Sequence, residues 1–139
     1  MEGRLFTYTF LEEYQNNIQP ALSEIDVFLK TAEYPLYTGD VACVLDIEEA
    51  EVIAILEEIG VGAIDRKAFL SIMQRGSSQI CRLYEREMQL GSPQIYTASQ
   101  IAYIYNLDIG LVKNACQKLQ IKEVTNFTIP FVFAQIPRP

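Results

Sequence analysis

The sequence contains no histidine. Without an imidazole the chain cannot build a Ser-His-Asp triad, a Cys–His nucleophile pair or a histidine-containing metal site. It also lacks the patterns G-x-x-x-x-G-K-[ST] and G-x-G-x-x-G, whose glycines let a backbone approach phosphate groups. We therefore expect no catalytic residues, no cofactor and no metal, and a protein that is not an enzyme and has no evident small-molecule substrate.

Cysteines and long hydrophobic runs are also scarce. Cys43, Cys81 and Cys116 are far apart, odd in number and form no C-x-x-C pair, which predicts buried, reduced thiols in a cytoplasmic protein. No apolar run approaches the roughly 18 residues that a membrane span needs. The start, "MEGRLFTYTFLEEYQNN", lacks a basic region followed by an apolar core, so we expect neither a signal peptide nor a membrane partner.

Charge is present but unevenly distributed. Of the 139 residues, 21% are charged and half are hydrophobic, which is typical of one globular domain or two very small ones. Residues 1–74 carry four basic and fourteen acidic side chains, a balance of −10, whereas residues 75–139 carry seven and four, a balance of +3. This asymmetry predicts two surfaces with different partners, or two surfaces that meet each other.

The first 34 residues are expected to be helical. Thr9 and Glu12 have the spacing of a capping box, and Pro20 suits the first turn of a helix because its missing N–H costs nothing there. Tyr34-Pro35 should end the helical segment, since a residue before proline avoids helical angles. We expect four regions along the chain: a helical segment (1–34), a first repeat (35–75), a connecting helix (76–92) and a second repeat (93–139).

The two repeats resemble each other in hydrophobic pattern. "LYTGDVACVLDIEEAEVIAILEEIGV" (36–61) matches "IYTASQIAYIYNLDIGLVKNACQKLQI" (95–121) at an offset of 59 that becomes 60 after one extra residue. Self-similarity of this length indicates duplication.

Each repeat has the layout of two helices joined by a sharp turn. Thr38 and Thr97 are expected to cap the first helix of each repeat. Asp46 and Asn106 stand at the turn, where a left-handed conformation is tolerated best by glycine, Asn and Asp. Asp108 can cap the second helix of the second repeat. This is the layout of a helix-turn-helix.

The pattern "YTxxxIAxxxNLDxxxVxxxxxKLxI" resembles the helix-turn-helix of the excisionase and mercury-resistance-regulator type. In the first repeat "VGAIDRKAFLSIM" resembles the short wing and following helix of excisionase-like domains. The resemblance covers residues 36–73 and 95–124. It implies a mostly α fold with two tandem, winged helix-turn-helix-like repeats, whose second helices would lie in the DNA major groove.

The second helices of the two repeats carry opposite charges. In the first repeat the side equivalent to a DNA-reading face is acidic and would be repelled by phosphate, so it is interpreted as a protein-interaction surface, or simply as a solvated face: Glu48, Glu49, Glu51, Glu57 and Glu58. In the second repeat the same side offers groups that can contact bases and phosphates, although an ordinary solvated helix face remains the alternative: Lys113, Asn114, Gln117, Lys118 and Lys122.

The C-terminal tail, "NFTIPFVFAQIPRP", is unusually apolar and is expected to pack against the second repeat. Alternating hydrophobicity in residues 127–136 favours a strand, whereas correspondence to residues 68–73 favours a helix, and both remain open. Taken together, the sequence predicts a non-enzymatic regulatory protein that acts through a protein partner or self-association, with DNA contact through the second repeat. The alternative is an assembly protein that uses the same fold without nucleic acid.

Overall fold

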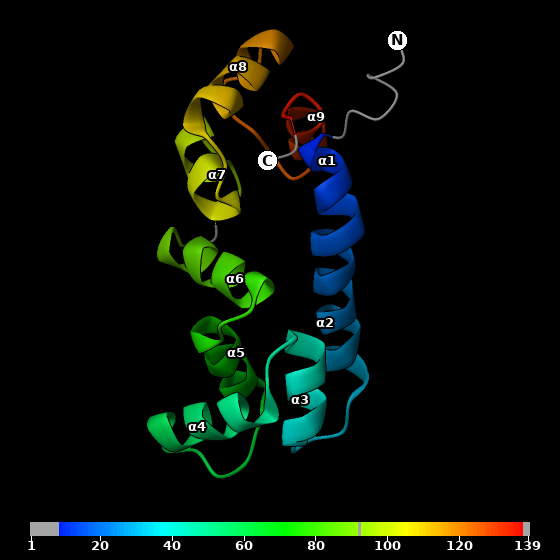
Figure 1. Ribbon diagram of the computed structural model, residues 1–139, viewed down its shortest axis with the longest axis vertical. Helices are drawn as coiled ribbons and strands as arrows, with labels where there is room; N and C mark the ends of the chain where they lie inside the picture. Colours follow the sequence, from blue (N-terminus) through cyan, green and yellow to red (C-terminus); the bar gives the residue numbers. More distant parts are fainter. Residues whose placement is uncertain (1–8, 92, 138–139) are drawn as a thin grey trace. The chain divides into compact units, whose positions relative to one another are not determined.

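Helices dominate the structure, which confirms the mostly α prediction. The computed structural model describes residues 9–91 and 93–137. Residues 1–8, the start of the segment in which we expect no signal peptide, lie outside the described residues. Within the described residues β-pairing is limited to isolated bridges. The elements in Figure 1 are α1 (Phe10–Glu13), the π-helix η2 (Tyr14–Ile18), α2 (Gln19–Thr31), α3 (Thr38–Leu45), α4 (Glu49–Ile59), α5 (Arg66–Arg75), α6 (Gln79–Gln89), α7 (Ala98–Tyr105), α8 (Ile109–Leu119) and α9 (Ile129–Phe133).

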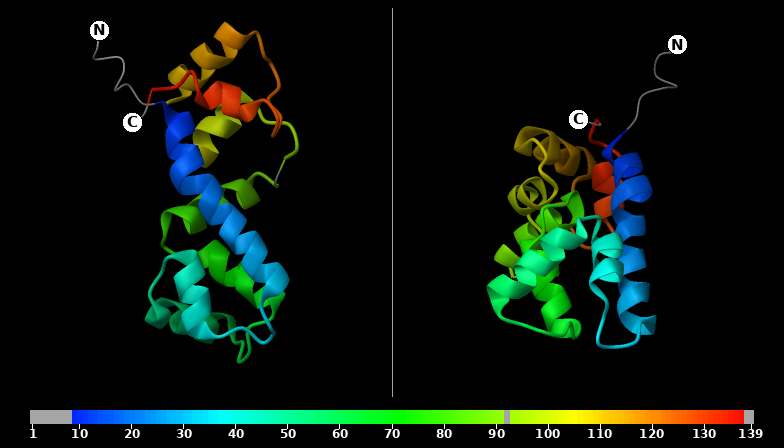
Figure 2. Two further views of the ribbon diagram at one scale, coloured as in Figure 1. Left: turned by 90° about the vertical axis from the view of Figure 1, so that its right-hand side faces the viewer. Right: turned by 60° about the horizontal axis from the view of Figure 1, so that its bottom comes forward.

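The chain divides into two compact units. The α3–α6 unit runs from Pro20 to Gln89 and therefore also contains α2 from Pro20 onwards. In this unit α3 packs on α4, α4 on α5 and α5 on α6 (Figure 2). The α7–α9 unit combines the chain up to Gln19 with the chain from Leu90 onwards, and in it α8 contacts α7 and α9 while α9 contacts α1. Each unit has its own fully buried side chains, such as Phe69 in the first and Phe133 in the second.

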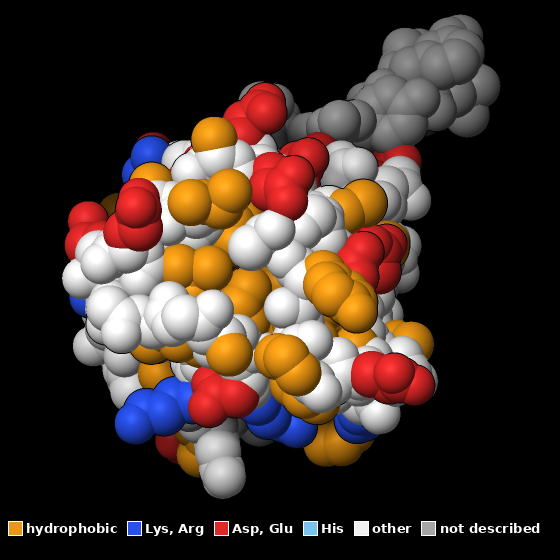
Figure 3. Space-filling view, turned by 90° about the horizontal axis from the view of Figure 1, so that it is seen from below, with side chains coloured by type: hydrophobic (Ala, Val, Ile, Leu, Met, Phe, Trp, Pro, Cys, Tyr) orange, Lys and Arg blue, Asp and Glu red, His pale blue; other side chains and the backbone are white. Residues whose placement is uncertain are grey.

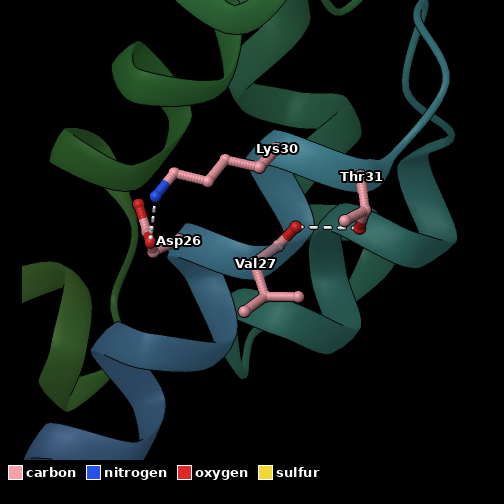
Figure 4. A network of polar contacts seen from close by, with 4 residues as sticks. All are labelled: Asp26, Val27, Lys30 and Thr31. Atoms are coloured by element: carbon pink, nitrogen blue, oxygen red, sulfur yellow. Dashed lines mark hydrogen bonds and ion pairs between the residues drawn. The ribbon is translucent and has the colours of Figure 1, made fainter.

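The N-terminal segment is helical from Phe10 to Thr31, as predicted, while residues 1–8 of the predicted segment lie outside the described residues. Glu12 and Thr9 form the expected capping box, in which the Thr9 N–H donates to the Glu12 carboxylate at 3.2 Å. The π-helix η2 ends just before Pro20, which has no N–H to donate and so cannot continue the regular i to i−4 ladder. The last turn of α2 is held by an Asp26–Lys30 ion pair of 2.9 Å and by the Thr31 hydroxyl, which donates to the Val27 carbonyl at 2.8 Å (Figure 4).

The same backbone hydrogen bonds occur at an offset of 60 residues. Leu36 N–H donates to the Ile64 carbonyl at 2.8 Å, and Tyr96 N–H donates to the Val124 carbonyl at 2.7 Å. The turn between the two helices is left-handed in both cases, with φ of 58° at Asp46 and 56° at Asn106. The predicted sharp turns at these two residues are therefore confirmed.

One predicted helix cap is wrong, because Tyr37, and not Thr38, is the residue equivalent to Thr97. Thr97 caps α7, accepting from the Gln100 N–H at 3.2 Å, and Asp108 caps α8, so these two predictions are confirmed. Thr38 does not cap α3: the N-cap is Tyr37, and the Thr38 hydroxyl donates instead to the Glu49 carboxylate at 2.5 Å. The reason is that the offset is already 60 at the Leu36 bridge, so no extra residue separates the two segments.

The segments expected to form wings are short loops. Residues 61–65 and 121–125 each contribute one residue to an isolated antiparallel bridge and form no strand within the described residues. In the first segment α5 begins at once, because the Asp65 carboxylate accepts from the Ala68 N–H at 2.8 Å and caps the helix.

The C-terminal tail forms a helix, which resolves the alternative left open by its sequence. Ile129, Val132 and Phe133 of α9 are buried, and so is Ile136 just beyond it. The Ile136 carbonyl accepts from the Phe10 N–H at 2.8 Å, so the end of the described chain is joined to the start of α1. The alternating pattern was misleading because Phe127 and Phe131, which alternate with the buried Ile129 and Phe133, are exposed.

Candidate protein and nucleic-acid interfaces

The residues predicted to contact DNA lie together on α8. Lys113, Asn114, Gln117 and Lys118 are all exposed, while Val112, Ala115 and Cys116 on the other side of the helix are buried. Lys113 with Gln117 and Asn114 with Lys118 are four residues apart, so the four side chains form two neighbouring rows on the helix surface. Lys122 is exposed in the loop that follows. The helix thus presents three ammonium groups and two amides on or just beyond its exposed side.

The N-terminus of α8 is already occupied by its own cap. The Asp108 carboxylate accepts from the Gly110 N–H at 2.8 Å and from the Leu111 N–H at 3.2 Å. Because the carboxylate satisfies these donors and adds negative charge there, the helix N-terminus is unsuited to a phosphate. Ile109 and Leu111 are also exposed. Any nucleic-acid contact would therefore have to use the middle and end of α8.

Three of the five glutamates predicted as a protein-interaction surface form polar contacts within their own unit. The Glu49 carboxylate accepts from Thr38, the Glu51 carboxylate accepts from the Ser77 N–H and hydroxyl at 2.7 Å each, and Glu58 forms an ion pair with Arg75. Glu51 is half-buried and the other four are exposed. Glu48 and Glu57 are therefore the members of this set best placed to meet a partner.

The charge asymmetry lies between the two compact units, and not between the first and second halves of the sequence. The α3–α6 unit contains six basic and thirteen acidic residues, whereas the rest of the chain contains five of each. The whole net charge of −7 therefore belongs to the α3–α6 unit. Counting along the linear chain missed this balance, because the acids of α1 belong with α7–α9 and the bases of α6 belong with α3–α5.

A groove between α2 and α3 is a concave feature of the α3–α6 unit. Its volume is about 510 Å³, and it is lined by Ser23, Glu24, Val27, Phe28, Asp40, Cys43 and Val44. Val27 is 57% exposed, although it belongs to a helix whose other side is buried. On the face drawn in Figure 3, hydrophobic side chains gather near the centre, with Asp and Glu side chains around them and Lys and Arg side chains along the lower edge. Sequence analysis missed this groove because the hydrophobic pattern of a single helix does not show which other helix lies beside it.

The three cysteines are free thiols, but their environments differ. Cys81 and Cys116 are buried as predicted, and burial raises the pKa of both thiols. The prediction was wrong for Cys43, which is exposed. The physical reason is that α3 turns Val41, Ala42 and Leu45 to the core, which leaves Cys43 on the groove side of the helix.

We expect maleimide to modify Cys43 selectively in the folded protein near neutral pH. The thiolate is the reactive form, and it is disfavoured at Cys81 and Cys116 by burial. Mass spectrometry should find one added group, at Cys43, and none in the Cys43→Ser variant. In urea all three thiols should react. Labelling of Cys81 or Cys116 as fast as Cys43 without denaturant would contradict the described burial.

Other potential sites are sparse. No group of three or more Cys, Asp and Glu side chains in the described residues is arranged to hold a metal ion. Among the acids and phenols, burial raises the pKa of Tyr84, with the negative charge of Glu87 adding to it. No helix in the described ranges is both long and apolar enough to cross a membrane.

Comparison with protein families, with curated proteins and with solved structures finds no match. The function is therefore inferred from this chain's own residues.

Proposed function

We propose that the chain is a non-enzymatic regulatory protein of tandem helix-turn-helix type, which acts mainly by binding a basic protein partner through its α3–α6 unit. The observation that carries this proposal is that the entire net charge of −7 lies in that unit. A field of one sign attracts a partner of opposite charge and speeds its association.

The helix-turn-helix assignment is supported by equivalent local geometry. In each repeat a short helix (α3, α7) ends at a left-handed Asp or Asn, and an eleven-residue helix (α4, α8) follows. The N–H groups of Ile47 and Leu107 donate to the equivalent Ala42 and Ala102 carbonyls at 3.0 and 2.9 Å. These contacts close the turn in the same way twice.

The non-enzymatic assignment is supported by the side chains available for chemistry. The chain has no histidine, two of its three thiols are buried in helices with raised pKa values, and the exposed Cys43 has no imidazole to activate it. A thiol that burial keeps protonated is a poor nucleophile.

The proposal can be tested with two peptides of equal length, one rich in lysine and one rich in glutamate, labelled for fluorescence anisotropy. The lysine-rich peptide should bind the full chain, its affinity should fall as salt is added, and the glutamate-rich peptide should not bind. Absence of lysine-peptide binding at low salt would reject the proposed partner class. Concentration-dependent assembly without any added partner, seen by sedimentation, would favour the alternative of an assembly protein.

A second function, DNA contact through α8, is favoured by the exposed Lys113, Asn114, Gln117 and Lys118. We expect weak binding of duplex DNA at low salt that falls by about tenfold or more in Lys113→Glu with Lys118→Glu, because phosphate contacts dominate such binding. The matched control is Arg66→Glu with Lys67→Glu, which makes the same charge change at two exposed residues of the α3–α6 unit. If both double variants lose binding equally, α8 is not a specific contact surface.

A further inference from the structure

We propose that the groove between α2 and α3 binds an amphipathic helix of a partner protein, with its apolar side in the groove and lysine or arginine residues flanking it. This inference rests on the proposed function, because it assigns the site and the kind of segment through which the α3–α6 unit binds its basic partner. It moves the predicted interface away from the α4 glutamates, three of which already hold contacts inside the unit.

The floor of the groove is apolar and accessible. Val27 and Phe28 of α2 line it together with Cys43 and Val44 of α3, and the volume of about 510 Å³ falls within the roughly 300–1,000 Å³ typical of ligand pockets. A groove between two helices is a common receptor for the apolar side of a third helix, which inserts large side chains at i, i+3 or i+4, and i+7.

Val44 marks a difference between the two repeats. It is equivalent to Ile104 at the offset of 60, and Ile104 is completely buried whereas Val44 is only half-buried. In the α7–α9 unit the N-terminal helical segment lies against Tyr105, the neighbour of Ile104, since the rings of Phe10 and Tyr14 each lie 6.1 Å from the ring of Tyr105. The equivalent of Tyr105 in the first repeat, Leu45, is completely buried, so the opening on α3 is limited to the groove side, where Val44 lies.

The charges around the groove specify a basic segment. Glu24 of α2 and Asp40 of α3 are both exposed, and every charged residue that lines the groove is acidic. The basic residue of α2, Lys30, forms an ion pair with Asp26 at 2.9 Å, which offsets its charge. Figure 4 shows that this pair extends to a different side of the helix from Val27. A helix with basic flanks would meet a carboxylate on each wall.

A partner protein fits this chemistry better than a second copy. The α3–α6 unit carries the full charge of −7, whereas the rest of the chain balances five bases against five acids. A second copy therefore offers the groove no net opposite charge, while a basic amphipathic helix does; the basic stretch of α8 (Lys113, Lys118) is the competing occupant that the test below distinguishes.

The test is a selection from a display library of helical peptides with apolar residues fixed at i, i+4 and i+7 and all other positions varied, using the full chain as bait. Selected peptides should be enriched in lysine and arginine on both sides of the apolar row. As synthetic peptides they should protect Cys43 from maleimide, and Val27→Asp should weaken their affinity by about tenfold or more. The matched control is Ile53→Asp, which makes a similar change at an exposed apolar residue of α4 outside the groove and should leave affinity unchanged.

The outcomes separate this inference from the proposed function. Basic peptides that leave Cys43 reactive, and that lose affinity in Glu48→Lys with Glu57→Lys instead, would place the partner on α4: the proposed function would stand and the groove assignment would fail. Selected peptides without basic residues would also overturn the groove assignment. Protection of Cys43 on concentrating the protein alone would assign the groove to a second copy. A library that yields no binder, together with no binding of the lysine-rich peptide, would reject both.

Discussion

Replacing Phe133 by alanine is expected to lower the free energy of unfolding of the α7–α9 unit by about 3–5 kcal/mol. Phe133 is completely buried in an aromatic cluster, with ring centroids 4.8 Å from Phe10, 5.0 Å from Tyr14 and 4.9 Å from Tyr105. The substitution removes all three contacts and leaves a cavity that α9, a helix of a single turn, cannot close by itself. Urea denaturation should show the loss as a lower midpoint.

The matched control lies two residues away on the same helix. Phe131 is 61% exposed, so Phe131→Ala should change the free energy of unfolding by less than about 0.5 kcal/mol. Phe133→Ala should also speed hydrogen exchange at the Phe10 amide, which donates to the Ile136 carbonyl at 2.8 Å just past α9. Equal losses from the two substitutions would mean that the cluster does not hold the unit together.

Replacing Gly76 by alanine is expected to lower the free energy of unfolding of the α3–α6 unit by about 1–3 kcal/mol, through overpacking. An added Cβ would lie 2.5 Å from the Cys81 Sγ and 3.4 Å from the Ile72 carbonyl oxygen. Cys81 is completely buried and has no room to move aside. The added methyl group would collide at the junction between α5 and α6. Urea denaturation followed by circular dichroism should therefore show a lower midpoint for the variant.

A double variant isolates the cause of this destabilisation. Cys81→Ala removes the sulfur atom that the new methyl group would meet, leaving the Cys81 Cβ as its nearest neighbour on that residue at 3.1 Å. Gly76→Ala with Cys81→Ala should therefore be more stable than the sum of the two single changes implies, with a coupling of about 0.5–3 kcal/mol. Gly62→Ala is the control, since nothing lies within 4 Å of a Cβ there. Additive losses would mean that the sulfur is not the obstacle.

The sequence by itself determined the local structure. The left-handed turns at Asp46 and Asn106, the caps at Thr97 and Asp108 and the capping box of Thr9 were all predicted correctly, because each depends on a few neighbouring residues and on backbone sterics. The exposed positions of α8 were carried over from the resemblance to helix-turn-helix domains, and Lys113, Asn114, Gln117 and Lys118 are exposed.

The tertiary structure decided what depends on residues far apart in the chain. The cap of α3 moved from Thr38 to Tyr37 because the Leu36–Ile64 bridge fixes the register. The exposure of Cys43 depends on the way α3 meets α2, and the true division of charge depends on which unit α1 and α6 join. Helical periodicity identifies the apolar side of a helix, but only packing between distant segments determines which apolar residues are covered and which, like Val27, stay open to a partner.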